Sequence, residues 1–134
     1  MLTSTIIFEL ACDYYKQNPT TVSKKNRKRE YVQTRQIAMF LSKNLTKESL
    51  ANIGRNIGDK DHATVLHACK TVKNLIDTDK KVFIDVMEIE KLCYFYVPFE
   101  IKNSFHYKSY YCFDKKEKRR IMFKFKNKKN AKRF

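Results

Sequence analysis

The chain has 134 residues, enough for one compact domain with an appendage and too few for two cores of ordinary size. Its 29 lysines and arginines against 14 acids give a formal net charge of +15 at pH 7, which predicts a surface that attracts polyanions, with nucleic acid as the first partner to test. An anionic membrane surface is the rival, but no apolar run approaches the roughly 20 residues of a spanning helix, and no secretory signal opens the chain. We therefore expect a cytoplasmic protein.

Charge and aromatic content divide the chain near residue 93. Residues 1–93 hold 16 Lys/Arg and 11 Asp/Glu, a net charge of +5, whereas residues 94–134 hold 13 and 3, a net charge of +10. The second segment also holds 12 of the 18 Phe and Tyr residues. We predict a folded domain over residues 1–93 and a basic aromatic tail over residues 94–134 that is irregular or partly disordered.

The N-terminal part of the domain begins with helical periodicity and then loses it. In STIIFELACDYYKQN, Ile6 or Ile7, Leu10 and Tyr14 follow one another at helical spacing, which predicts a first helix that ends before Pro19. The next stretch, TTVSKKNRKRE, holds five basic residues within residues 24–29 and little to bury. It is predicted to be a solvated loop or short turn, and its charge makes it a candidate basic arm.

Two helices are predicted between this loop and Gly58. Within residues 32–45, Ile37, Leu41 and Leu45 recur every four positions, which indicates a long helix with one buried face. Thr46 is expected to cap a shorter helix that follows. That helix keeps its apolar spacing until Gly58, a residue that can adopt the left-handed conformation at a helix end.

The segment GDKDHATVLHACK begins the helix of greatest interest. Asp61 is a good N-cap for a helix over residues 61–77, with a predicted buried face of Val65, Cys69, Val72 and Ile76 and an opposite face of Ala63, His67, Lys70 and Asn74. A short helix, a turn with glycine and a longer helix with a polar outer face form the helix-turn-helix pattern. A last helix is predicted over residues 80–93.

Catalytic and metal-binding readings of this segment are weak. His62 and His67 are five residues apart and therefore about 140° apart around a helix, so they cannot hold one ion together. The four cysteines, Cys12, Cys69, Cys93 and Cys112, are too widely spaced for a metal knuckle, and we expect them to be reduced. With only two glycines the chain has no phosphate-binding loop, so we expect no ATP site, no cofactor and no enzyme.

The same residues suit DNA reading. The first turn of a recognition helix presents short polar groups and methyls to base edges, and its free N–H groups favour phosphate. Two plainer interpretations stay open from residue type alone: Asp61 as an ordinary helix cap, and His62 as a histidine at the edge of the core.

RQIAMFLSKNLTKESLANIG followed by DKDHATVLHACKTV resembles the C-terminal DNA-binding domain of the bacterial replication initiator DnaA, over residues 5 to 92. The resemblance implies an all-α, TrpR-like domain that binds double-stranded DNA at the short DnaA box, one chain to a box. It implies base contacts in the minor groove from Arg27 and in the major groove from Asp61, His62 and Ala63. Contacts to phosphate, or residues that set register, are implied at Lys25, Arg29, Arg35, Gln36, Lys43, Lys47, Lys60, Thr64 and His67.

Three positions depart from the family pattern. Ala63 stands where Thr or Ser is usual, Asp59 replaces a second glycine, and Ala51 stands where proline is common. In a full initiator an AAA+ ATPase precedes this domain, so we expect box recognition without intrinsic ATP-dependent assembly.

Two alternatives remain open. The basic aromatic tail suits non-specific binding of RNA or single strands, because aromatic rings stack on bases while lysine and arginine neutralise the backbone. The chain is alternatively a non-functional fragment of an initiator gene, with a tail read from non-native sequence.

Overall fold

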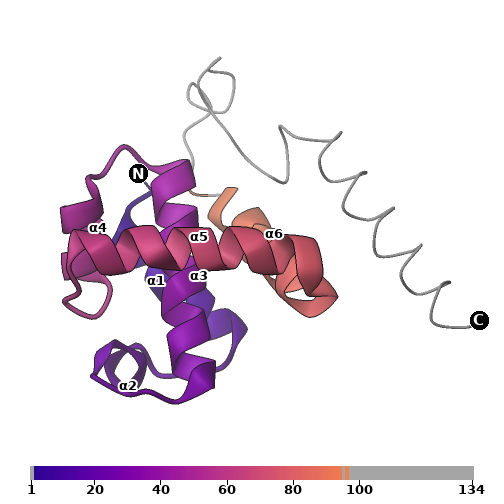
Figure 1. The fold of residues 1–134 in the computed structure, drawn as a ribbon, viewed down its shortest axis with the longest axis horizontal. Coiled ribbons are helices and arrows are strands. Elements are labelled where there is room, and N and C mark those ends of the chain that lie inside the picture. The colour runs from indigo at the N-terminus through magenta and orange to yellow at the C-terminus, as the bar shows by residue number, and fades with distance from the viewer. Residues whose placement is uncertain (1, 95, 97–134) are drawn as a thin grey trace, which may run out of the picture.

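The computed structural model describes residues 2–94 and residue 96, and every regular element in that part of the chain is an α-helix. The predicted all-α class is therefore confirmed. The predicted tail, apart from Tyr94 and Tyr96, lies outside the described residues. The helices in chain order are α1 (Ser4–Tyr14), α2 (Pro19–Ser23), α3 (Arg29–Leu45), α4 (Leu50–Asn56), α5 (His62–Thr78) and α6 (Lys80–Tyr94) (Figure 1).

The chain between α1 and α3 corrects part of the predicted loop. Residues 19–23 form α2, in which Asn18 accepts a hydrogen bond from the Thr20 N–H at 2.9 Å and Pro19 occupies the first turn. Proline is favoured there because its fixed φ suits a helix start and its missing N–H would have no partner in the helix. Val22 is fully buried and anchors the short helix, so only residues 24–28 form the expected loop.

Helix α3 is the central element, and α5 crosses in front of it (Figure 1). Helix α3 begins at Arg29, three residues before the predicted start, and buries one face that includes Ile37, Ala38 and Leu41. Thr46 was expected to cap α4, and this is wrong. The Thr46 hydroxyl donates to the Ser42 carbonyl at 2.6 Å and accepts at 3.3 Å from the N–H of Glu48, a residue that precedes α4. The N-cap of α4 is Ser49, whose side chain accepts from the Asn52 N–H at 3.1 Å.

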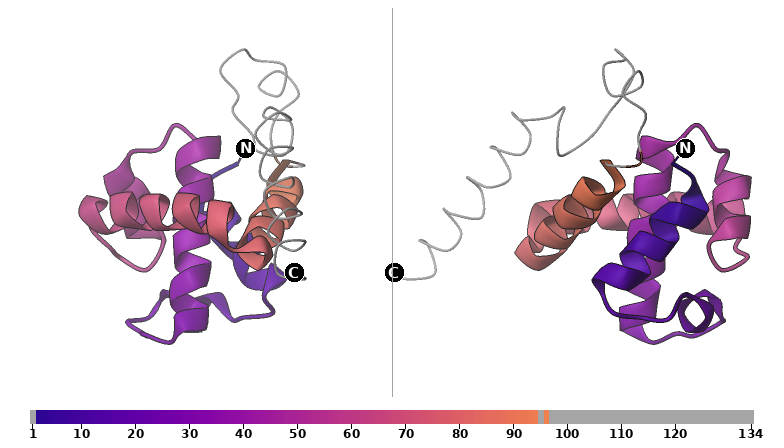
Figure 2. Two further views of the ribbon diagram at one scale, coloured as in Figure 1. Left: turned by 45° about the vertical axis from the view of Figure 1, so that its right-hand side comes forward. Right: turned by 180° about the vertical axis from the view of Figure 1, so that it is seen from behind.

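The prediction for the two faces of α5 is confirmed. Val65, Cys69, Val72 and Ile76 are buried against the core, and Ala63, His67, Lys70 and Asn74 are exposed. Helices α1 and α6 lie behind α5 and pack on α3 and on each other, as the view from behind shows (Figure 2). The result is one hydrophobic core that holds α5 by its inner face and leaves the outer face free.

Two polar networks fix α1 to the rest of the domain. The buried carboxylate of Asp85 in α6 accepts hydrogen bonds from the hydroxyls of Tyr14, at 2.9 Å, and Tyr15, at 2.7 Å. At the other end of α1, the Glu48 carboxylate accepts from the Ser4 N–H at 2.7 Å. Among the described residues, no helix is long and apolar enough to cross a membrane.

Candidate nucleic-acid interface

Helices α4 and α5 are joined by a tight turn over residues 57–61. Gly58 has φ +80° and Asp59 has φ +51°, so two successive residues adopt the left-handed conformation. The Lys60 N–H donates to the Gly54 carbonyl at 2.8 Å, which brings the end of the turn back onto α4. A Cβ at Gly54 would overlap the Lys60 carbonyl oxygen, so this close approach requires glycine. The geometry fixes the start of α5 relative to α4.

The first turn of α5 presents a polar, exposed surface. Asp61 caps the helix by accepting a hydrogen bond from the Thr64 N–H at 2.8 Å, and this bond lowers the pKa of its carboxyl. Asp61, His62, Ala63 and Thr64 are all exposed. Asp61 is therefore the helix cap, and the alternative of His62 as a core-edge histidine is wrong. The helix N-terminus therefore opens to solvent.

The exposed face continues along α5 and includes an apolar residue that the sequence did not single out. Leu66 is 39% exposed and follows His62 by four residues, so it lies on the same face. His67 and Lys70 are also exposed beside it. The signal available in the sequence was the helical spacing from His62, but a leucine in an amphipathic helix is ordinarily assigned to the core.

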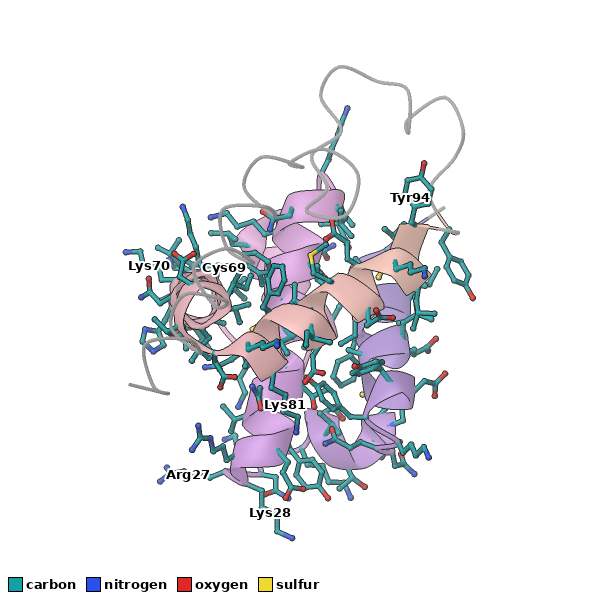
Figure 3. All side chains as sticks on the ribbon, turned by 90° about the vertical axis from the view of Figure 1, so that its right-hand side faces the viewer. Arg27, Lys28, Cys69, Lys70, Lys81 and Tyr94 are labelled. Atoms are coloured by element: carbon teal, nitrogen blue, oxygen red, sulfur yellow. The ribbon has the colours of Figure 1, made fainter. Side chains whose placement is uncertain are left out.

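Residues 24–28, here called the basic loop, form the second part of the interface. Lys24, Lys25, Arg27 and Lys28 are all exposed, while Asn26 accepts a hydrogen bond from the Lys28 N–H at 3.0 Å and gives the loop a local turn. Arg27 lies near the start of α3, on the same side of the molecule as α5 and its Lys70 (Figure 3). Arg27 of the basic loop and Lys70 on the outer face of α5 therefore lie on one side of the molecule.

Most residues predicted to contact phosphate are open to solvent, and one is not. Arg29, Lys43 and Lys47 are exposed, and Gln36 and Lys60 are partly exposed.

Arg35 differs, because it is only 7% exposed and its guanidinium donates to carbonyl oxygens of α2 and the basic loop. Burial lowers the pKa of Arg35, although an arginine stays protonated at neutral pH. The geometry therefore does not resemble an open phosphate contact.

Metal-binding and thiol chemistry receive no support from the geometry of the described part of the chain. There, no three His, Cys, Asp or Glu residues gather in a way that could hold a metal ion. Cys12, Cys69 and Cys93 are free thiols buried in the core, and burial raises the pKa of Cys12 and of Cys93 to about 12. Cys112 lies outside the described residues.

A tight turn between two helices, with the second helix exposing its polar first turn, defines a helix-turn-helix protein. A family model described as the bacterial dnaA protein helix-turn-helix matches residues 5–72, so the chain belongs to that family.

Three chromosomal replication initiator proteins DnaA illustrate the likeness. The protein of Flavobacterium psychrophilum is 57% identical over 81 residues, which are 59% of this chain and 17% of the relative. That of Bacteroides thetaiotaomicron is 51% identical over 86 residues, 64% of this chain and 18% of the relative. That of Laribacter hongkongensis is 40% identical over 86 residues, with the same shares. The chain thus spans less than a fifth of the length of these relatives.

Proposed function

We propose that this protein binds double-stranded DNA in a sequence-specific way, at a site like the DnaA box, in the initiation or regulation of DNA replication. Helix α5 is proposed to enter the major groove, and the basic loop the adjacent minor groove, with one chain bound to each site. The observation that carries the proposal is that the α5 first turn and the basic loop are both exposed, with Arg27 of the loop on the same side of the molecule as α5 and its Lys70 (Figure 3). Membership of the dnaA helix-turn-helix family supports it.

Base contacts are proposed for the first turn of α5 because of its chemistry. A carboxylate such as Asp61 accepts from the amino group of cytosine, His62 can donate to or accept from a base edge, and the Ala63 methyl suits the thymine methyl. Leu66 extends this apolar contact on the same face. Direct readout of the major groove would come from these residues.

The minor-groove contact is proposed for Arg27. An exposed arginine in a basic loop ahead of a helix-turn-helix can enter the narrow groove, where the negative potential is strongest. The other residues of the interface would contact phosphates or set the register without reading sequence. The residues proposed for this role are Lys25, Arg29, Gln36, Lys43, Lys47, Lys60, Thr64 and His67.

A binding titration by fluorescence anisotropy tests the proposal. The full chain is titrated with a duplex that carries a DnaA box and with a scrambled duplex of equal length, at a series of salt concentrations. We expect a clear preference for the box and, from about six to eight phosphate contacts, a log–log salt slope of about −5 to −7. Equal affinity for the two duplexes would contradict sequence-specific binding.

Single substitutions then assign the roles. Arg27→Ala and His62→Ala should each weaken box binding by about 1–3 kcal/mol, and His62→Ala should reduce the preference for the box most. Asn74→Ala is the matched control, because Asn74 is exposed on α5 but lies about 18 Å further along the helix. A loss at Asn74 as large as that at His62 would contradict the assigned reading surface.

The same titration with single-stranded DNA and with RNA of the box sequence separates the main alternative. Binding led by the basic aromatic segment beyond residue 94 should favour single strands, because stacking needs unpaired bases. We expect the duplex to bind more tightly, and tighter binding of the single strands would contradict the proposal.

A further inference from the structure

The buried side chain of Arg35 connects the two parts of the proposed interface. Its Nη1 donates to the Val22 carbonyl at 2.7 Å and to the Lys24 carbonyl at 3.4 Å, and its Nη2 donates to the Asn26 carbonyl at 2.9 Å. These carbonyls come from the end of α2 and from alternate residues of the basic loop. The backbone that leads to Arg27 is therefore held by a single guanidinium.

The stem of the same side chain lies against the helix-turn-helix turn. A Cβ at Gly58 would be 3.2 Å from the Cδ of Arg35 and 3.3 Å from the carbonyl oxygen of Ser23. Both distances are tighter than ordinary contact, so the turn, the loop and Arg35 meet without room for a side chain on Gly58. Arg35 thus touches the segment that leads into α5 as well as the segment that carries Arg27.

Arginine suits this place for two physical reasons. Its planar guanidinium carries five donors in a fixed fork, so it can serve carbonyls that lie in different directions, whereas the compact ammonium of lysine acts as a point charge. Its aliphatic stem can pack on apolar or backbone surface at the same time. A side chain that is 7% exposed and directs its donors inward is poorly placed to meet a phosphate.

We propose that Arg35 is a positioning residue, which fixes the basic loop relative to α5 so that Arg27 and the first turn of α5 enter adjacent grooves together. It sets DNA specificity through Arg27 and does not contact DNA. This inference rests on the proposed DNA binding, but its first consequence concerns the free protein. Loss of the Arg35 fork should release the loop while the helical core stays folded.

Limited proteolysis of the free protein tests that consequence. Trypsin cleaves after the lysines and arginines of the basic loop, and the loop must open locally to enter the protease. We expect Arg35→Lys to be cleaved in the loop about tenfold faster than wild type or more, because at least one of the hydrogen bonds to the carbonyls is lost. Lys43→Gln, an exposed substitution on α3, is the control and should be cleaved there at the wild-type rate.

DNA binding gives the second test, by a double-mutant cycle with Arg27→Ala. If Arg35 acts through Arg27, the penalty of Arg27→Ala should nearly vanish in the Arg35→Lys background. Arg35→Lys should also lose affinity for the box although its charge is kept. If Arg35 instead contacted a phosphate, the penalties of Arg27→Ala and Arg35→Lys would add, and Arg35→Lys would bind the box nearly as tightly as wild type. The log–log salt slope of Arg35→Gln would then be about one unit shallower, as in Lys43→Gln. That set of results would overturn the inference.

The wild-type protein provides a measurement that needs no variant to fold. Nuclear magnetic resonance of the arginine side chains should show slowly exchanging Nη protons of Arg35 in the free protein, and these signals should persist when the box duplex is added. Rapid exchange in the free protein, or protection that arises only with DNA, would overturn the positioning role. If wild type fails to prefer the box, the proposed function fails, whereas the proteolysis and the free-protein spectra still decide the role of Arg35.

Discussion

Gly54 is the position in α4 where a single added methyl group should weaken the domain. Replacing glycine by alanine inside a helix ordinarily stabilises a protein by about 0.5–1 kcal/mol. Here the new Cβ would overlap the carbonyl oxygen of Lys60 and lie 3.1 Å from Cγ2 of the buried Val65. The carbonyl belongs to the backbone and cannot rotate away as a flexible side chain would, so the turn must move.

The magnitude follows from the two effects that oppose helix propensity. Overpacking costs about 1–3 kcal/mol. Displacement of the turn also weakens the 2.8 Å hydrogen bond from the Lys60 N–H to the Gly54 carbonyl, a further loss of about 1 kcal/mol. After the gain in propensity is subtracted, Gly54→Ala should lower the free energy of unfolding by about 1–3 kcal/mol and lower Tm by about 5–20 °C.

Urea unfolding followed by far-ultraviolet circular dichroism measures this loss, with an unchanged m value as the sign that the folded state stays compact. Ala51→Gly is the matched control, since it makes the reverse exchange, alanine to glycine, at an exposed position of the same helix. It should cost only about 0.5–1 kcal/mol. A Gly54→Ala variant as stable as wild type would refute the reasoning, because helix propensity would then outweigh the contact with Lys60.

Two further predictions concern charged groups in the free protein, both measured by urea unfolding across pH. Asp85→Ala should cost about 3 kcal/mol, since the carboxylate accepts two hydrogen bonds from partly exposed tyrosines. Burial, and then the hydrogen bond to Asp85, raises the pKa of Tyr14 to about 12 and also raises that of Tyr15. The stability that these two tyrosines contribute is therefore fully present below about pH 10 and falls as pH rises towards 12. A free energy of unfolding that stays constant between about pH 10 and 12 would contradict this. The pKa of Asp61 is lowered by the Thr64 N–H, so its stabilisation is present above about pH 4 and is lost as pH falls further. Asp61→Asn should keep the cap but no longer show this loss of stability at low pH. If the free energy of unfolding of Asp61→Asn fell below about pH 4 as it does in wild type, Asp61 would not be its source.

The sequence predicted what depends on local periodicity. The two faces of α5 and the Asp61 cap follow from spacing and residue type within one helix, and both agree with the structure. The cap of α4 was missed because Thr46 and Ser49 are both good caps, and the choice depends on where the helices end and begin: Thr46 follows the last residue of α3, and Ser49 precedes the first residue of α4. Spacing along one helix could not decide between them.

Arg35 was hidden from the sequence for a different reason. Its partners are carbonyl oxygens 9 to 13 residues away, and a backbone acceptor leaves no trace in residue type. The resemblance to the DnaA domain implied a contact with phosphate or a role in setting register at this position, and neither indicates burial. Burial at 7% exposure separates it from the exposed Arg29 and Lys43 of the same helix.

The departures from the family pattern change the chemistry offered to DNA more than the backbone that offers it. Asp59 takes the left-handed conformation at φ +51° beside Gly58, and aspartate is among the residues that tolerate this region, so the turn still forms. Its exposed carboxylate adds a negative charge one residue before Lys60, close to where a phosphate would lie in the proposed complex. Ala63 is exposed on a correctly capped helix, so its methyl can still meet thymine while a hydroxyl is absent. In the proposed complex, a difference in the preferred DNA sequence should therefore arise at the bases facing Ala63, and a difference in phosphate binding beside Asp59, with the proposed docking of α5 unchanged.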